Sequence, residues 1–132
     1  MVGIVFLLVG ISGFIPAVTT NYDTLAWAGH HSDALLFALF QVSILHNIVH
    51  LAFGIAGIAM AGSIGTARAF LVGGGIVYLA LWIYLLIEQG CAANFVPVNT
   101  ADNWLHRCLG IVMVALGLRT WRTTAHPQSA LR

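Results

Sequence analysis

The sequence contains very little charge. It has no lysine, five arginines and four acidic residues, so charged side chains make up 7% of the chain while 60% of its residues are hydrophobic. A soluble domain needs roughly a quarter of its residues charged, so this composition excludes a water-facing globule. The net charge of +1 gives no electrostatic reason to bind nucleic acid. The expected partner of most of the surface is therefore the lipid bilayer.

Cysteines and catalytic motifs are also scarce. Two cysteines are too few for a disulfide framework. The sequence holds no nucleophile–base pair, phosphate loop or zinc-protease motif, which favours a non-enzymatic role. Residues 1–18 are apolar but lack the basic leader and the cleavage site of a secretory signal. We therefore expect this stretch to remain in the protein as a membrane span.

Long apolar runs are what the chain does have. About 20 helical residues cross a hydrocarbon core of about 30 Å, and four segments reach roughly that length. The sequence predicts an all-α membrane fold, a bundle of four transmembrane helices forming a single domain over residues 1–132. The expected spans are about 2–19, 43–61, 67–87 and 100–120. Ser43 and Thr100 are the predicted N-caps of the second and fourth helices.

The arginines predict the orientation. One lies between the second and third spans and three follow the fourth span, whereas the loops 21–33 and 89–99 contain neither Arg nor Lys. The arginines in question are Arg68, Arg119, Arg122 and Arg132. Because basic residues favour the cytoplasmic side, we expect a multi-pass protein of a bacterial cytoplasmic membrane with both termini in the cytoplasm.

An internal repeat joins the second and fourth spans. Residues 42–55 match residues 98–111, with Asn47 opposite Asn103, His50 opposite His106, and His46 in the place of Asp102. A weaker echo pairs residues 6–10 with 70–74. The repeat predicts two tandem helical hairpins related by a pseudo-twofold axis along the membrane normal.

Helical spacing places the polar residues of the repeat on common faces. His46 and His50 are four residues apart, as are Asp102 and His106, so each pair shares a face. If the hairpins face each other, the two polar faces meet about two turns, or roughly 10 Å, below the outer surface. Polar side chains at that depth usually face the interior of a bundle.

Three interpretations of this cluster remain open. The first is a hydrogen-bonded polar cluster that fixes how the helices pack. The second is a divalent metal site, of zinc or a similar ion, with His46, His50, Asp102 and His106 as ligands. The third is a cofactor site for haem or a quinone, formed by His50, His106, Asn47 and Asn103.

Other residues of the spans have simpler predicted roles. The glycines at seven-residue intervals are expected to be packing seams, and Gly73, Gly74 and Gly75 mark a flexible point or a close helix approach. Tyr78 is expected to face lipid or to pack. Arg107 is expected to reach the outer surface or to pair with Glu88.

Three motifs carry a family resemblance. Residues 45–51 (Leu-His-Asn-Ile-Val-His-Leu), 99–106 (Asn-Thr-Ala-Asp-Asn-Trp-Leu-His) and 10–16 resemble those of a bacterial, mainly actinobacterial, four-helix membrane family of unknown function. The resemblance implies a four-span inner-membrane protein and no particular activity. We expect a non-enzymatic scaffold or accessory subunit that binds other membrane subunits or a second copy of itself. The alternative is a redox or metal-handling protein that uses the His/Asp/Asn cluster.

Overall fold

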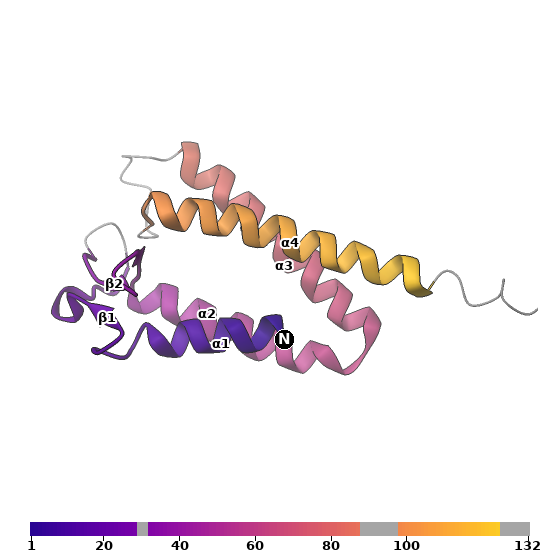
Figure 1. Cartoon of the computed structure of the whole chain (residues 1–132), viewed down its shortest axis with the longest axis horizontal. Helices are drawn as coiled ribbons and strands as arrows, with labels where there is room; N and C mark the ends of the chain where they lie inside the picture. Colours follow the sequence, from indigo (N-terminus) through magenta and orange to yellow (C-terminus); the bar gives the residue numbers. More distant parts are fainter. Residues whose placement is uncertain (29–31, 88–97, 125–132) are drawn as a thin grey trace, which may run out of the picture.

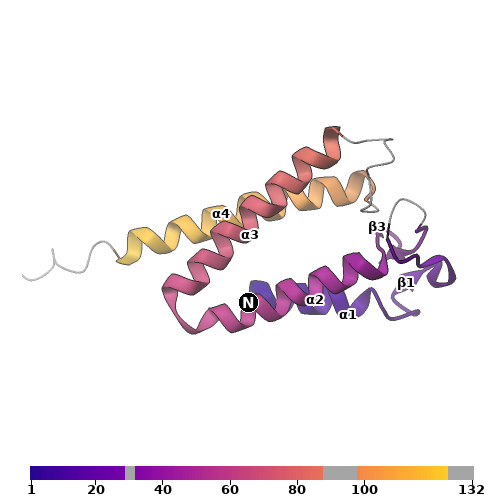
Figure 2. The same cartoon turned by 180° about the vertical axis from the view of Figure 1, so that it is seen from behind.

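The computed structural model describes residues 1–28, 32–87 and 98–124, and it is mostly helical. Helix α1 packs along α2, and α3 packs along α4, so the helices form two hairpins (Figure 1). Helices α2 and α3 scarcely touch, and they diverge from the short 3-10 turn η2 that joins them (Figure 2). The bounds are α1 Val2–Ser12, α2 Ile44–Ala59, η2 Met60–Gly62, α3 Ile64–Ile87 and α4 Thr100–Thr124.

Glycines bring the two helices of each hairpin into close contact. A Cβ added at Gly3 would lie 2.9 Å from the carbonyl oxygen of Gly54, and one added at Gly75 would lie 2.9 Å from that of Gly110. Gly74 is also closely packed, but nothing lies within 4 Å of the position that a Cβ on Gly73 would take. The predicted glycine seams are therefore present inside both hairpins, and only part of the triple glycine belongs to one.

The first helix is shorter than the sequence analysis predicts. A helix over residues 2–19 was expected, but α1 ends at Ser12. Proline is the reason, because its ring clashes with the carbonyl group four residues earlier and disfavours helical backbone at the residue before it. Pro16 thus ends the helix at Ser12, and turns follow up to residue 18.

The segment between α1 and α2 corrects the all-α expectation. We call residues 13–28 and 32–43 the cap segment. It contains a three-stranded antiparallel sheet in the order β1-β2-β3 and one 3-10 turn, η1. Their bounds are β1 Thr19–Thr20, η1 Tyr22–Thr24, β2 Leu35–Leu36 and β3 Phe40–Gln41. Buried Ala34, Leu36 and Val42 form its small core with Val9 of α1, which seats the cap on the end of the first hairpin.

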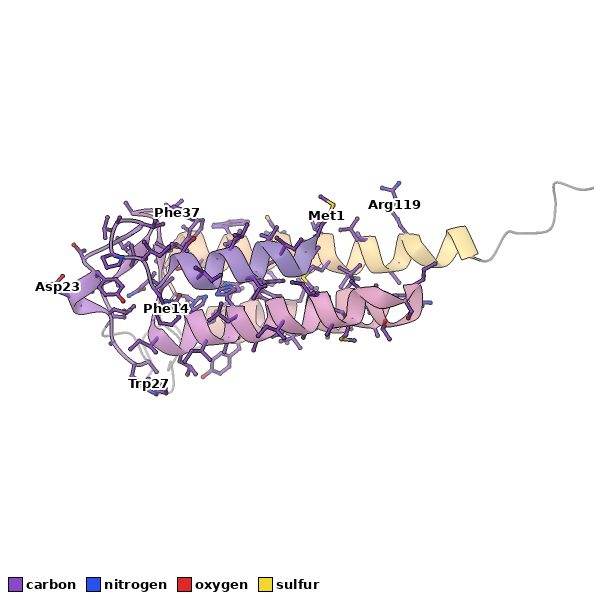
Figure 3. The ribbon with its side chains drawn as sticks, turned by 90° about the horizontal axis from the view of Figure 1, so that it is seen from below. Met1, Phe14, Asp23, Trp27, Phe37 and Arg119 are labelled. Atoms are coloured by element: carbon purple, nitrogen blue, oxygen red, sulfur yellow. The ribbon has the colours of Figure 1, made fainter. Side chains whose placement is uncertain are left out.

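The cap contacts the second hairpin through hydrogen bonds. The backbone N–H of Gln41 donates to Oδ2 of Asp102 over 2.9 Å, and Nδ2 of Asn99 donates to the carbonyl oxygen of Leu39 over 2.6 Å. Phe37, in the turn between β2 and β3, has a left-handed φ of 53°, and its side chain is exposed at the cap (Figure 3). The cap segment therefore joins the two hairpins at the end opposite η2.

Capping residues fix where the helices begin. The Ser43 hydroxyl accepts a hydrogen bond from the His46 N–H over 3.1 Å, as predicted for an N-cap. Thr100 is not a cap but the first residue of α4, and the capping residue is Asn99. Its side-chain oxygen accepts from the Asp102 N–H, while the Asp102 carboxylate accepts from the Asn99 N–H. This reciprocal pair is a capping box, which a lone threonine does not supply.

Two helical segments are long and apolar enough to cross a membrane, and they run over Ile44–Gly62 and Ile64–Leu86. Only 17% and 22% of the residues in their most apolar stretches are buried. The core helix of a soluble protein would be mostly buried, so their exposed apolar surfaces fit a lipid environment better.

Candidate functional site

Two histidines, one from each hairpin, pack against aromatic rings in the same way. His50 of α2 stacks on Phe6 of α1 at a centroid distance of 5.8 Å, and His106 of α4 stacks on Tyr78 of α3 at 5.3 Å. Phe6 and Tyr78 touch each other at 5.5 Å. All four side chains are buried. The two hairpins therefore meet through a continuous row of rings.

His46 completes a group of three imidazoles. Its ring stacks on His50 with centroids 4.6 Å apart and lies 5.9 Å from that of His106. The structure thus brings together the three histidines that the repeat singled out. Stacked rings direct their nitrogens along the ring planes rather than toward one shared point, which is a poor arrangement for chelating a single ion.

Asp102 lies near these histidines, but its carboxylate has other partners. It is buried and accepts hydrogen bonds from the backbone N–H groups of Gln41 and Asn99, each over 2.9 Å. Within the described residues, no group of three or more His, Cys, Asp or Glu side chains is placed to hold a metal ion. The structure therefore does not assemble the predicted quartet of His46, His50, Asp102 and His106 as a metal centre.

The main chain of Asp102 orients His106. Its carbonyl oxygen lies 2.7 Å from Nδ1 of His106, and a carbonyl can only accept, so Nδ1 carries the proton. In a neutral imidazole the other nitrogen, Nε2, is then a hydrogen-bond acceptor. This is the usual way in which a backbone carbonyl selects the tautomer of a functional histidine.

Asn47 and Asn103 are buried, and polar atoms of their side chains lack hydrogen-bond partners among the described residues. In this part of the chain, neither Oδ1 nor Nδ2 of Asn47 has a hydrogen-bond partner, and the same holds for Oδ1 of Asn103. Asn47 packs against Gly13, just beyond the end of α1. A purely structural polar cluster would be expected to pair these atoms, because unpaired buried polar groups are costly.

Cavities flank the imidazoles on two sides. One cavity, which we call the principal cavity because the histidines line it, lies between α2 and α3 and has a volume of about 220 Å³. Its apolar walls are interrupted by three histidines and one tyrosine. A smaller cavity of about 70 Å³ lies on the cap side and reaches Phe37 and Asp102. The principal cavity is lined by Leu45, His46, Val49, His50, Phe53, Val77, Tyr78, Leu81 and His106.

The chain matches the profile of one protein family. The profile of a family described as Domain of unknown function (DUF4383) matches residues 1–119. The chain belongs to the DUF4383 family. No curated protein and no solved structure matches it. The resemblance to a family of unknown function is therefore confirmed, and the family brings no assigned activity to the site.

The aromatic half of this DUF4383 site was not predicted from the sequence. Tyr78 is buried and packs, which was one of its two predicted roles, but its stacking on His106 was not foreseen. A clear signal was present: Gly3-Ile-Val-Phe6-Leu recurs as Gly75-Ile-Val-Tyr78-Leu. The weaker echo between Phe6 and Phe70 gave the wrong register, because Tyr78, and not Phe70, repeats the histidine stacking of Phe6.

The Arg107 side chain contacts two aromatic rings. Its guanidinium lies 5.2 Å from the ring centre of Trp82 and 5.1 Å from that of Trp104, which is the geometry of a cation–π contact. Glu88, its alternative predicted partner, lies outside the described residues.

Proposed function

We propose that this DUF4383 protein is a four-span membrane protein that binds a lipid-soluble small molecule between its two hairpins. The observation that carries the proposal is the principal cavity, where His46, His50, His106 and Tyr78 interrupt otherwise apolar walls. Ligand sites are typically apolar clefts with a few convergent polar groups. The gap between α2 and α3 offers such a molecule a direct route from the lipid.

The pairing of the helices supports four membrane-embedded segments, although α1, with 11 residues, is too short to cross the hydrocarbon core as a helix alone. If α2 and α3 cross the bilayer, then α1 and α4 must occupy the same slab, because each packs lengthwise along one of them. The two repeated motifs, Gly-Ile-Val-aromatic-Leu in α1 and α3 and Asn-x-x-His in α2 and α4, support a pseudo-twofold axis along the membrane normal. The ligand would then sit beside that axis, at the interface of the two repeats, where transporters with parallel repeats also place their sites.

The distribution of charge supports cytoplasmic termini. Arg68 follows the η2 turn in the chain, and Arg119 lies toward that same end, whereas Asp23 and Trp27 lie at the cap end (Figure 3). No arginine or lysine occurs anywhere in the cap segment. By the positive-inside rule, the η2 end faces the cytoplasm and the cap faces the outside of a bacterial cytoplasmic membrane.

The test is whether the purified protein retains a compound in this cavity. Val49 lines the cavity and is 42% exposed, whereas Val112 on α4 is 52% exposed and lines none of the cavities described. Wild type, Val49→Trp and Val112→Trp are purified in detergent, and their organic extracts are compared by mass spectrometry. We expect a stoichiometric compound other than phospholipid in wild type and Val112→Trp, and its loss from Val49→Trp. Equal retention by all three proteins, or none in wild type, would refute the proposal.

A role as an accessory subunit is the second candidate, and it is compatible with ligand binding. Gly65, Ala69 and Gly73 form an exposed row of small residues along α3, beside a hollow that also touches Arg68 and Leu118. Small residues at this spacing allow another transmembrane helix to approach closely. Gly73→Leu should therefore weaken association with other membrane subunits or with a second copy, measured by cross-linking in native membranes, while Gly62→Leu in the turn should not.

A further inference from the structure

We propose that the ligand of the principal cavity is a hydroquinone with a long apolar tail, with its head beside His106 and its tail in the groove between α2 and α3. This inference rests on the proposed function and specifies the chemical class of the ligand. It joins two observations made on different parts of the molecule: the tautomer of His106 and the continuation of the cavity along α2 and α3.

The tautomer of His106 requires a ligand that donates a hydrogen bond. Nδ1–H is committed to the Asp102 carbonyl over 2.7 Å, so Nε2 offers a lone pair. A hydroquinone hydroxyl can donate to it, whereas a quinone carbonyl, which only accepts, cannot. The head group therefore matches the site in its reduced form.

The walls of the cavity require a neutral and flat head. Among the described residues, no Asp, Glu, Arg or Lys lines the principal cavity, so a charged head would lose its hydration without gaining a partner there. Phe53 and Tyr78 line it with their rings nearly perpendicular, at an angle of 86° and a centroid distance of 5.6 Å. An aromatic ring can stack on one of these walls and meet the other edge-on.

A third cavity, between α2 and α3, provides space for the tail of the ligand. It has a volume of about 420 Å³ and continues from the principal cavity, with which it shares Phe53 and Val77. From there it follows α2 to Met60 and α3 to Ala69. Met60 lies fourteen positions after His46, which corresponds to a helical rise of about 21 Å. Every described residue lining this groove is apolar, so it suits a hydrocarbon chain attached to a head at the histidines.

The experiment uses the full chain in one detergent, so that partitioning of the probes into micelles is the same for every protein. The probes are a decyl-chain benzoquinol kept reduced, the corresponding decyl-chain benzoquinone, and a benzoquinol without the tail, each titrated by calorimetry. The variants are His106→Leu at the head, Ala52→Phe in the tail groove, and Ala80→Phe as a matched control on α3. Ala52 and Ala80 are both exposed, so neither change disturbs the core.

We expect wild type and Ala80→Phe to bind the decyl quinol at least about tenfold more tightly than the decyl quinone. Ala52→Phe should weaken the decyl quinol by about tenfold, which corresponds to 1.4 kcal/mol, and leave the tail-less quinol unchanged. His106→Leu should abolish the preference for the reduced form. Equal binding of quinol and quinone to wild type, or no effect of Ala52→Phe, would overturn the inference. If wild type retains a different compound and binds no quinol, the proposed function stands and the hydroquinone is excluded.

Discussion

Phe6 and Tyr78 lie ring to ring with centroids 5.5 Å apart, although 72 residues separate them in the chain. Each is the aromatic residue of a Gly-Ile-Val-aromatic-Leu motif, and each stacks on the histidine of its own hairpin. A contact between equivalent positions is what the proposed twofold axis would produce at the point through which it passes. The two hairpins therefore meet at equivalent positions of the repeated motif.

A double-mutant cycle tests this contact. Phe6→Leu and Tyr78→Leu should show a coupling energy of about 0.5–1.5 kcal/mol, the usual range for an aromatic pair beyond the area that it buries. The measurement is reversible unfolding in mixed micelles. Phe6→Leu combined with Trp104→Leu is the control, because Trp104 is 57% exposed and its ring partner is Arg107. Additive effects of Phe6→Leu and Tyr78→Leu would contradict the contact.

Two glycines of α3, Gly73 and Gly75, should respond oppositely to replacement by alanine. In Gly75→Ala, the new Cβ would lie 2.9 Å from the Gly110 carbonyl oxygen and 3.0 Å from the Val114 nitrogen, so backbone must move, at a cost of about 1–3 kcal/mol. Gly73→Ala meets nothing within 4 Å and should be neutral or stabilising by up to about 1 kcal/mol. Thermal unfolding in detergent compares the two variants, and equal destabilisation would argue against the described packing of α3 on α4.

Asp102→Ala should destabilise the protein, because Oδ2 of Asp102 is the shared acceptor of two backbone N–H groups. The N–H groups of Gln41 and Asn99 would both lose this partner. The expected cost is about 1–3 kcal/mol, measured as a lower unfolding temperature. Asp23→Ala, at an exposed position of the cap segment, is the matched control. A variant as stable as the control would show that these hydrogen bonds contribute little.

Metal and optical analysis should give no stoichiometric signal for the purified protein. Wild type, His50→Ala and His106→Ala should all lack a Soret band and a bound divalent metal, because the stacked imidazoles do not converge on one point and Asp102 is engaged elsewhere. The metal content and the visible spectrum of the two variants should therefore match those of wild type. A metal or haem signal that disappears in both variants would replace the proposed ligand with that cofactor.

Cysteine labelling in intact cells tests the orientation. With Cys91 and Cys108 replaced by serine, a membrane-impermeant maleimide should label Asp23→Cys in the cap without permeabilisation. It should reach Ala61→Cys, in the η2 turn, only after the membrane is opened. Labelling in the opposite order would invert the proposed topology.

The sequence-based predictions succeeded where spacing within one helix decides the outcome. The four-residue interval of His46 and His50 places both rings on one face, and the local hydrogen bond of Ser43 starts α2 where expected. The predictions failed where contacts between segments that are distant in the sequence determine the structure. Asn99 and Asp102 form a capping box that also bonds to the cap segment. The stacking of Tyr78 on His106 depends on the close approach of α3 to α4 at Gly75. Neither relationship is visible in one segment alone.

The cap segment is translated early, but its hydrogen bonds to the second hairpin can form only late in synthesis. During synthesis the N-terminal hairpin emerges first, and the backbone N–H of Gln41 then has no Asp102 to bond to, because α4 has yet to be translated. Arrival of the last helix supplies that acceptor and, through Asn99, a donor for the Leu39 carbonyl. The final helix therefore completes the cap segment, and this end of the protein reaches its final form only after all four helices have been made.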